Sequence, residues 1–463
     1  MAGETVIHDA TIVTADNAGT IHYDAALAVI GSRIEAIGPA AELLARYPEA
    51  DRVNGRGRVV LPGFANTHTH FTMTLARGIY EDLSPPHRPP FAGGLAELPL
   101  PQLDAAERKV MAEVAAIEAI RSGTTLVLED GAGVEGHAAS LLQSGLRCLL
   151  TERAWDRANA AIGQPGPFEI SEALAESGLA RITRCHSRWH GKGDGRIQVG
   201  VSAWAPDMCS PALLHRLRDL QSKLDAVATI HLNQIWGEVA AVREQRGLLP
   251  TEYLAREGFL SDRLVAAHCR CMTAAEERLL GGSCAAVAFN SAIAARRGLS
   301  PRVSELESAG CLIAMGTDNM SEDMVEVMRT GLFMERVRRQ DGRHPTPEDV
   351  LAWATRNGYS ALGVPDGGWL ASGNKADLIV IDARKAHLAP MLRVVSDLVH
   401  QGQASDVESV MVDGRWIMRD GRVLTLDERA IVQEAEIVGR AAWRRLFDKR
   451  RDLVPPSGFD LRA

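Results

Sequence analysis

Several features that would place this chain in a specialised class of protein are missing from it. No run in its 463 residues approaches the roughly 18 apolar residues that cross a membrane, and the first residues, MAGETVIHDATIVT, lack the basic and apolar regions of a signal peptide. A positive surface charge is also lacking, since the net charge is -8. Nucleic acid and anionic membranes repel such a protein. We therefore expect a cytoplasmic protein whose partner is a small molecule, with no nucleic acid and no membrane.

Paired cysteines are scarce as well. The chain has 7 cysteines, an odd number, and none of them forms a C-x-x-C pair. Reduced thiols fit this pattern better than a disulfide framework does. Cys269 and Cys271, in HCRC (268–271), are spaced closely enough for a thiolate metal site, but no second cysteine pair accompanies them. We assign no metal to these thiols.

Both ends of the chain show the pattern of short strands. Alternating β-branched residues broken by Gly and Asn run through the first 60 residues, and the same pattern returns at 375–385 and at 407–423, where Asp-Gly pairs mark hairpin turns. We expect the two ends to build one small β-domain. The middle of the chain would then be inserted into it.

Short apolar runs alternate with helical stretches through the middle of the chain. Strands that are apolar throughout and separated by helices indicate a parallel sheet buried on both faces. Eight such strands make a TIM (β/α)8 barrel, an α/β fold. The runs are residues 58–68, 124–130, 146–152, 197–204, 226–232, 263–268, 285–290 and 311–318. The stretch 427–451 is expected to be one helix that Asp427 starts.

The first of these runs ends in PGFANTHTH (62–70), with two histidines one residue apart. Residues i and i+2 of an extended chain point to the same side, so the imidazoles of His68 and His70 converge. A metal ion is one object that two neutral imidazoles can share.

Other barrel strands also end in polar residues. His231 ends the fifth strand, His268 the sixth and Asp318 the eighth. Barrel enzymes place their active residues at the carboxyl ends of the strands, so these side chains and the two histidines of the first strand should surround one cavity and share a metal site. The remaining histidines are assigned to the surface or to loops. His87 is singled out among them because it lies in the long loop after the first strand.

The chain resembles the amidohydrolase superfamily in an ordered set of sequences. They are PGFANTHTH, HLNQ (231–234), VAAHC (265–269) and AMGTDN (314–319), while RGI, SGTT, GNKADLIVID and VMVDGRW resemble its triazine-hydrolase and cytosine-deaminase-like branch. The resemblance implies a TIM barrel with a small composite β-sandwich domain formed from both termini. We expect sandwich segments at 1–60 and 370–425, the metal-dependent hydrolase barrel at 61–369, and a helix with a tail at 426–463.

The resemblance also implies a metal site. His68, His70, His231 and Asp318 would bind one divalent ion, zinc or alternatively iron(II), and His268 would lie beside the metal-bound water. Related enzymes with two ions bridge them through a modified lysine on the fourth strand, which is absent from IQVGVSAW (197–204). One ion per chain is therefore expected.

The predicted chemistry follows from this ion. A divalent cation lowers the pKa of bound water from 15.7 toward about 7, which supplies hydroxide at neutral pH. Asp318 would take the proton of that water and His268 would hydrogen-bond the water or the developing oxyanion. Hydroxide would then attack an sp² carbon of a nitrogen heterocycle, or of an amidine- or urea-like group, and release ammonia or an amine. The predicted function is that of an aminohydrolase, or deaminase.

Two positions depart from the family that the chain resembles. The strand-five sequence of that family usually ends in a glutamate thought to shuttle a proton to a ring nitrogen, whereas this chain has Gln234, and an amide has no titratable proton. Either Asp318 handles every proton transfer, or the substrate needs no ring protonation, or Gln234 only hydrogen-bonds the substrate. In FNSAIAARRG (289–298), Arg296 and Arg297 either bind a substrate carboxylate or carbonyl or are solvated loop charges. His87 is a further candidate for substrate binding.

Two other functions remain open at this point. An amide, carbamate or halide hydrolase would use the same metal site, and a barrel that has lost catalysis would act as a binding or assembly scaffold. The ligand set argues against the scaffold, and only Gln234 supports it. Relatives of the family lead us to expect a homodimer or a homotetramer.

Overall fold

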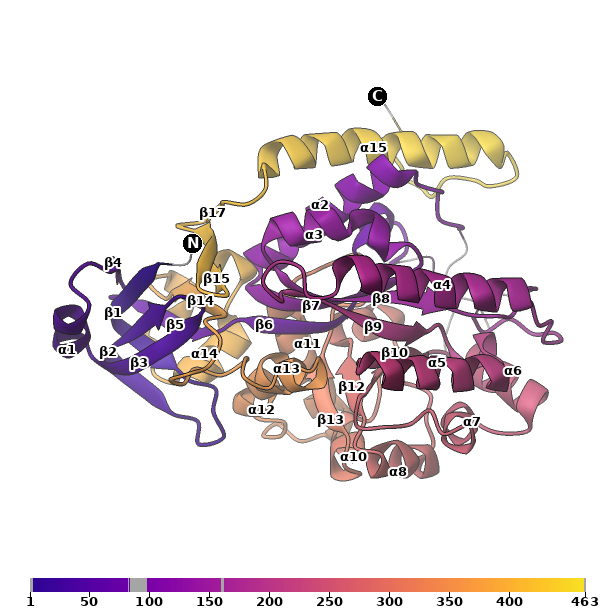
Figure 1. Cartoon of the computed structure of the whole chain (residues 1–463), viewed down its shortest axis with the longest axis horizontal. Helices are drawn as coiled ribbons and strands as arrows, with labels where there is room; N and C mark the ends of the chain where they lie inside the picture. The colour runs from indigo at the N-terminus through magenta and orange to yellow at the C-terminus, as the bar shows by residue number, and fades with distance from the viewer. Residues whose placement is uncertain (1–2, 82, 84–97, 160–161, 462–463) are drawn as a thin grey trace.

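The computed structural model describes residues 3–81, 83, 98–159 and 162–461. His87 lies outside the described residues. The chain builds two sheets, one from both ends of the sequence and one from its middle, and Figure 1 shows them side by side.

The sheet from the two ends has nine strands. Its order is β17-β16-β15-β14-β5-β1-β2-β3, with β4 paired to β1. The strands from the first part of the chain are β1 (Glu4–Val13), β2 (Ile21–Ile30), β3 (Arg33–Pro39), β4 (Asp51–Asn54) and β5 (Arg58–Pro62), and those from the last part are β14 (Leu378–Asp382), β15 (Val407–Val412), β16 (Arg415–Arg419) and β17 (Arg422–Val423). The predicted composite domain is confirmed, because β5 and β14 pair antiparallel and so join the two ends.

This sheet also curls back on itself. Ile34 in β3 donates its main-chain N–H to the carbonyl of Asn374 at 2.9 Å and accepts from Gly373 at 2.8 Å. The enclosed face buries apolar side chains from both ends of the chain, among them Ile7 and Leu27 from the first and Leu378 from the last. The short helix α1 (Ala40–Arg46) follows β3 and buries Leu43.

The second sheet is the predicted barrel, and its eight strands are parallel to their neighbours. A parallel bridge between Thr69 and Asp318 joins the first strand to the last. The strands are β6 (Phe64–Thr69), β7 (Thr124–Gly131), β8 (Arg147–Ala154), β9 (Ile197–Ala203), β10 (Ala228–Leu232), β11 (Leu264–His268), β12 (Ala286–Phe289) and β13 (Leu312–Met315). They are buried along nearly their whole length, as expected of strands covered on both faces.

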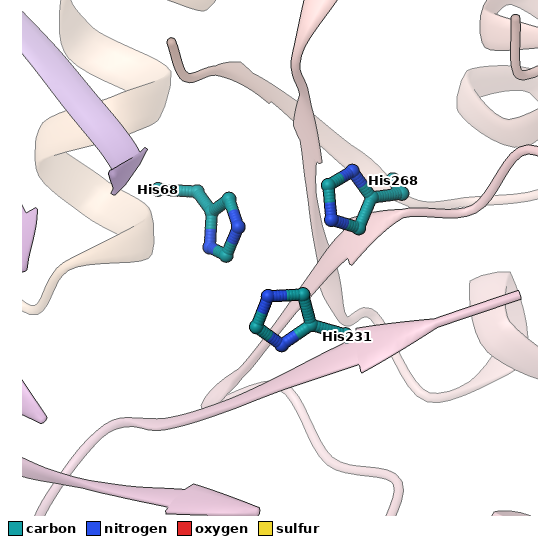
Figure 2. Close-up of side chains that lie close together, drawn as sticks. All are labelled: His68, His231 and His268. Atoms are coloured by element: carbon teal, nitrogen blue, oxygen red, sulfur yellow. The ribbon is translucent and has the colours of Figure 1, made fainter. Parts of the chain in front are cut away.

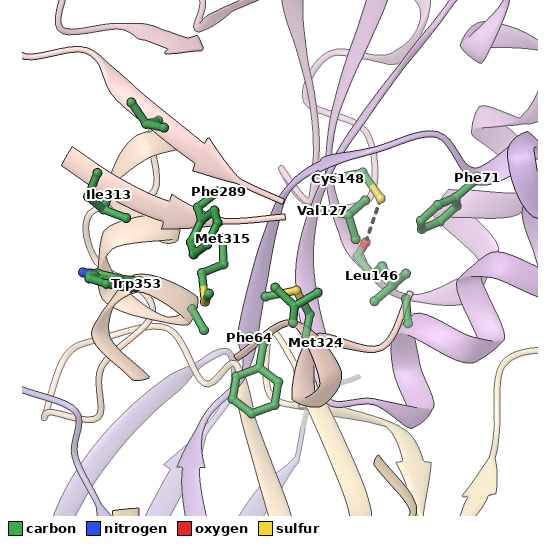
Figure 3. Close-up of a cluster of buried hydrophobic side chains, with 14 of the residues drawn as sticks. Phe64, Phe71, Val127, Leu146, Cys148, Phe289, Ile313, Met315, Met324 and Trp353 are labelled. Atoms are coloured by element: carbon green, nitrogen blue, oxygen red, sulfur yellow. Dashed lines mark hydrogen bonds between the residues drawn. The ribbon is translucent and has the colours of Figure 1, made fainter. Parts of the chain in front are cut away.

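Helices surround this barrel. They are α2 (Ala105–Arg121), α3 (Ala138–Ser144), α4 (Glu172–Trp189), α5 (Pro211–Leu224), α6 (Trp236–Arg246), α7 (Pro250–Arg256), α8 (Ala274–Gly282), α9 (Ser291–Arg297), α10 (Val303–Ser308), α11 (Met324–Arg339), α12 (Pro347–Ala354) and α13 (Arg356–Ala361), with α14 (Val394–Gln401) between β14 and β15. Short segments of 3-10 helix occur at Phe71–Ala76 (η1), Val134–His137 (η2), Pro206–Met208 (η3), Ala386–Leu388 (η4) and Ala404–Asp406 (η5). The side chains between strands and helices form a continuous apolar core, part of which Figure 3 shows around Phe64, Phe289 and Trp353.

The sequence predicts one strand over 58–68, whereas the structure divides this run at Gly63 between the two sheets. A Cβ atom at Gly63 would lie 2.1 Å from Thr125 Oγ1, closer than real contacts allow. Only glycine fits at this crossing, where its N–H donates to the carbonyl of Asp377 at 3.1 Å. The apolar pattern continues through Gly63 because both strands are buried.

A buried ion pair fixes the terminal sheet against the barrel. Arg147, the first residue of β8, donates to the carboxylate of Asp377 at 2.8 and 3.1 Å and to that of Asp413 at 3.2 Å. Since Arg147 begins its strand, the terminal sheet packs at the amino ends of the barrel strands. Their carboxyl ends, where the predicted site residues lie, point away from it.

The helix predicted near the end of the chain is α15 (Glu428–Lys449), which lies across the top of Figure 1 next to α2. The Asp427 side chain caps it by accepting from the N–H of Ala430 at 3.2 Å. Trp443, on the buried face of this helix, donates its indole N–H to the carbonyl of Leu75 at 2.8 Å. Neither α15 nor any other helix in the described part of the chain combines the length and apolarity of a membrane span.

Candidate metal centre

The polar residues predicted to share a site do lie together at the carboxyl ends of the barrel strands. Figure 2 shows His68 from β6, His231 from β10 and His268 from β11 pointing toward one another. The ring centre of His68 lies 4.8 Å from that of His231 and 5.1 Å from that of His268. His70 completes the group, with its ring 4.7 Å from that of His68.

Asp318 joins these histidines from the loop after β13. Its Oδ1 atom lies 3.6 Å from His70 Nε2 and 4.0 Å from His68 Nε2. The Nε2 atoms of His70 and His231 are 3.2 Å apart. Ligand atoms this close to one another fit around a single ion, and the combinations of side chains that can do so in the described part of the chain overlap at this one place.

Two of the histidines are held in the orientation that a metal requires. His70 Nδ1 lies 2.6 Å from the carbonyl oxygen of Asp130, and His231 Nδ1 lies 3.0 Å from that of Trp204. A carbonyl can only accept, so each Nδ1 carries the hydrogen. The lone pair of each Nε2 is then free for an ion, and a hydrogen bond of this kind fixes the ring and raises its basicity.

In His268 the roles of the two ring nitrogens are the reverse of those in His70 and His231. Its Nδ1 lies 3.3 Å from an Arg270 guanidinium nitrogen and 3.1 Å from Asn290 Nδ2, and both of these atoms donate. Nδ1 must therefore accept, which puts the hydrogen of the neutral ring on Nε2. This Nε2 is buried and has no partner within the described residues. With this hydrogen position His268 is a hydrogen-bond donor at the edge of the group, although its ring nitrogens also lie close enough to those of His68 and His231 to share an ion.

All three histidines of Figure 2 are kept neutral by their surroundings. Burial lowers the pKa of His68, His231 and His268 well below the ordinary value, and nearby imidazoles and guanidinium groups lower it further. Neutral imidazole is the form that binds a metal. Both ring nitrogens of His68 are buried without a hydrogen-bond partner in the described part of the chain, so the side chain has unused ligand capacity.

The main chain is strained where two of these residues sit. His268 has φ 79° and Asp318 has φ 69°, a conformation that side chains other than glycine rarely adopt. The strain at Asp318 is held by its N–H, which donates to the carbonyl of His68 at 2.9 Å, and by its carbonyl, which accepts from His70 at 3.0 Å. Gly316 allows this approach, since a Cβ there would lie 2.9 Å from the main chain of His68.

Sequence reasoning missed the acidic residues that support the site. Asp130 at the end of β7 accepts from Arg153 at 2.5 and 3.1 Å, while its own carbonyl holds His70. Burial acts to raise the pKa of Asp130, but Arg153 together with His70 and His68 outweighs it, and the pKa is lowered. The only signal was its position at a strand end, next to Glu129.

Glu322 supports the first strand from a loop. It is fully buried and accepts from Thr69 at 2.7 Å, Thr317 at 2.9 Å and Asn66 at 3.0 Å. Burial and the nearby Glu118 raise its pKa well above the ordinary value. These contacts join the first barrel strand, β6, to the loop after the last, β13. No sequence pattern marks Glu322 for this role.

Glu129, to which the sequence assigned no role, also has a structural one. It accepts from the N–H of Phe71 at 2.9 Å and lies 3.1 Å from His137 Nε2. His137 was expected at the surface or in a loop but is buried. Its burial follows from this partner, because a polar side chain enters the interior only when it is hydrogen-bonded.

The residues predicted to bind substrate differ in their burial and in their hydrogen-bond partners. Arg296 is bound through two hydrogen bonds, of 3.0 and 3.1 Å, to Glu326. Its neighbour Arg297 is buried, and its Nε has no partner within the described residues. Gln234 is buried beside β10, and its side-chain oxygen is likewise without a partner there. Arg270, which sequence analysis did not select, touches His268 directly.

Comparison with known proteins agrees with this geometry. The model of the amidohydrolase family matches residues 59–417, and a bacterial imidazolonepropionase-like composite domain matches residues 25–50. A 5-methylthioadenosine/S-adenosylhomocysteine deaminase of Moorella thermoacetica is 32% identical over 439 residues, which are 93% of this chain and 97% of that protein.

Solved structures show the same fold. An adenosine deaminase from Xanthomonas campestris with bound zinc superposes with a TM-score of 0.83 at 26% identity, covering 97% of this chain and 99% of that one. An atrazine chlorohydrolase from Arthrobacter aurescens complexed with zinc has a TM-score of 0.82 at 18% identity, covering 94% and 100%. The chain therefore shares its fold with a member of the triazine-hydrolase branch that its sequence resembles. The chain belongs to the amidohydrolase family and is a metal-dependent hydrolase.

Proposed function

We propose that this chain is a deaminase with one zinc ion, which hydrolyses the bond between an amino group and a ring carbon of a nitrogen heterocycle. The observation that carries the proposal is the convergence of unused ligand atoms. The lone pairs of His70 and His231 meet at 3.2 Å beside Asp318 and the unpartnered ring of His68. Imidazole nitrogens with one carboxylate oxygen suit zinc.

The residues fit a single ion better than two. His68, His70, His231 and Asp318 would hold it, and β9 offers no lysine as a bridge to a second. A zinc ion at this place would act as a Lewis acid that makes water nucleophilic near neutral pH. The zinc bound to the similar adenosine deaminase supports this choice of metal.

The protein groups then divide the proton transfers. Asp318 Oδ2 is buried without a hydrogen-bond partner in the described residues and lies 3.9 Å from His268 Nδ1, so it is placed to accept the proton of the attacking water. The same carboxyl can pass that proton to the departing amine. His268 offers its Nε2–H to oxygen as charge develops on it, and this donation stabilises the transition state.

Gln234 limits the substrates that suit this site. Its amide can donate and accept a hydrogen bond but cannot deliver a proton. The proposal therefore favours a ring that needs no protonation from this position. The names of the relatives favour an amine on a purine-like ring, since the Moorella thermoacetica protein is named for 5-methylthioadenosine and S-adenosylhomocysteine.

The test is metal analysis followed by a substrate screen. The zinc-loaded protein is offered 5-methylthioadenosine, adenosine, guanine, cytosine and aminated hydroxytriazines, and ammonia is measured. We expect ammonia from at least one ring amine, with water oxygen incorporated into the product. If none of the ring amines released ammonia, while an acyclic amide gave a carboxylate with its amine or a chlorinated ring released chloride, an amide or halide hydrolase would be supported instead. Loss of bound metal without loss of turnover would refute the proposal.

A further inference from the structure

An arginine beside the candidate metal centre is buried almost completely. Arg270 is 6% exposed and lies two residues after His268. Its main-chain N–H donates to the carbonyl of Asn233 at 3.0 Å, which fixes the loop after β11 against the end of β10. Its guanidinium donates once, to His268 Nδ1 at 3.3 Å. The remaining buried nitrogens, Nε and one terminal nitrogen, have no partner in the described part of the chain.

A second arginine is buried nearby. Arg297, the last residue of α9, is 9% exposed and makes no hydrogen bond or ion pair with any described residue. Its neighbour Arg296 has the ordinary surface arrangement, a pairing with Glu326. The contrast separates two adjacent arginines of one helix. Arg296 is paired, and Arg297 has no hydrogen bond or ion pair within the described part of the chain.

The two buried guanidinium groups act on each other and on Asp318. Burial, and next to it the charge of Arg297, lowers the pKa of Arg270 to about 10, while Asp318 raises it. Burial also lowers the pKa of Arg297, again against Asp318. Arg270 therefore still carries its charge at neutral pH. Asp318 is the one carboxylate that acts strongly on both, and it also has to serve the metal.

Such an arrangement is costly in the absence of a counter-ion. Charged side chains are rarely fully buried unless they are paired, and a guanidinium offers a planar fork of donors that matches a carboxylate or a similar oxyanion. Gln234, which follows Asn233, adds a neutral side chain at the same strand end. The site therefore combines candidate metal ligands with two buried cations. Among the described residues, Asp318 is the carboxylate that acts on both, while Glu238 acts on Arg270 and Glu81 acts on Arg297.

We propose that Arg270 and Arg297 form a subsite for an oxyanion that the substrate carries on its ring, beside the carbon that is attacked. The contact between Arg270 and His268 puts the subsite next to the reacting atoms rather than at the far end of a long substituent. The inference rests on the proposed function, which supplies the aminated ring. It narrows the substrate to a heterocycle with an ionised carboxylate or an ionised ring oxygen.

Binding of three unreactive pyrimidines to the zinc-loaded protein tests this subsite. Orotate carries a carboxylate, barbiturate carries its negative charge on ring oxygens, and uracil is neutral. Their affinities are measured by titration calorimetry. At least one anion should bind about 10- to 100-fold more tightly than uracil, the range expected of charged hydrogen bonds. The preferred anion identifies the source of the oxyanion. Equal binding of all three would overturn the proposal.

Substitutions then separate the arginines from the metal, which also attracts anions. Arg270→Gln and Arg297→Gln should each remove most of the preference for the anion, while Arg296→Gln, the matched control on the same helix, should leave it unchanged. A preference that survives both Gln variants would come from the metal alone and would contradict the subsite.

Thermal melting gives a second readout that does not depend on turnover. Without an anion, Arg297→Gln should melt at or above the temperature of the wild type, because the change removes a buried charge that has no ion pair with any described residue. The preferred anion should raise the melting temperature of the wild type and not that of the variant. A variant that melts lower and still responds to the anion would assign Arg297 a structural role instead. If no ring amine released ammonia while these binding results held, the proposed function alone would fail.

Discussion

The two sides of the candidate metal centre differ in how their charged groups are partnered. On the side of β6 to β10, Asp130 is paired with Arg153, and His70 and His231 donate to main-chain carbonyls. On the side of β11 and β12, Arg270 and Arg297 are buried with no acidic partner among the described residues.

This difference shows which part of the site has its hydrogen-bond and ion-pair partners within the protein and which part has buried charges that a bound anion could pair. On the first side, main-chain carbonyls orient two of the candidate ligands, His70 and His231. On the second side, the burial of two charged guanidinium groups without an ion pair to any described residue lowers the stability of the fold. Natural proteins keep such destabilising arrangements mainly at functional sites. We infer that the first side sets the chemistry and the second sets the choice of substrate.

Loss of a metal ligand should have the largest effect. Replacing His68, His70, His231 or Asp318 with Ala should reduce kcat by more than about 10⁴-fold, since the ion and its activated water are lost. His215→Ala, an exposed histidine paired with Glu257 at 3.0 Å, is the control and should keep full activity. Turnover is measured with the ring amine found in the screen. A variant with the kcat of the wild type would show that the replaced residue does not bind the catalytic metal.

Removal of His268 should have the next largest effect. His268→Ala should lower kcat by about 10²–10³-fold, the range seen when a donor to a developing oxyanion is removed. His268→Gln retains an N–H donor and should recover part of this loss. Equal activity of the Ala variant and the wild type would show that no charge develops near Nε2.

A weaker effect is expected from the support of His70. Arg153→Ala leaves the buried Asp130 unpaired and loosens the carbonyl that orients His70, so zinc should bind about 10- to 100-fold more weakly. The control is Arg184→Ala, whose guanidinium forms an exposed pair with Glu135 at 2.7 Å. Competition with a zinc chelator measures both affinities. An unchanged affinity in Arg153→Ala would mean that Asp130 holds its position without this partner.

The smallest effect on the natural substrate is expected at Gln234. Gln234→Glu adds a carboxylate to a pocket adapted to a neutral amide, so kcat/KM should stay equal or fall by about tenfold or less. On neutral aminated purines or pyrimidines the new acid should instead raise turnover, because general acid catalysis of amine loss becomes available. A pH-rate profile and a substrate panel compare the two proteins at equal zinc content. A rise of several orders of magnitude on the natural substrate would make Gln234 an impairment.

The fold and the grouping of the candidate ligands could be predicted from the sequence because local patterns determine them. The spacing of His68 and His70 fixes their common direction, and His231 and His268 end apolar runs whose carboxyl ends meet in any barrel of this kind. The structure brings all of them together as expected. Asp318 ends the last of these runs, so its position placed it in the same group, and the amidohydrolase resemblance agreed. The family itself is confirmed by the comparisons.

The substrate side could not be predicted in the same way. Adjacent residues of a helix point about 100° apart, so the sequence ARRG does not say which of Arg296 and Arg297 faces the interior. Arg270 follows a residue with φ 53°, Cys269, and the direction of a side chain after such a bend depends on the strand beside it. Asp130 and Glu129 alternate on one strand, and only the packed barrel shows which side each one takes.

The most direct test of this account is the zinc content of His231→Ala beside that of His268→Ala. The hydrogen bonds give His231 a free lone pair on Nε2 and give His268 a hydrogen on the same atom, although both rings point into one group. Elemental analysis after gel filtration should find close to one zinc per chain in the wild type and in His268→Ala, and almost none in His231→Ala. Loss of zinc from His268→Ala, or full zinc in His231→Ala, would contradict the division into ligands and donor.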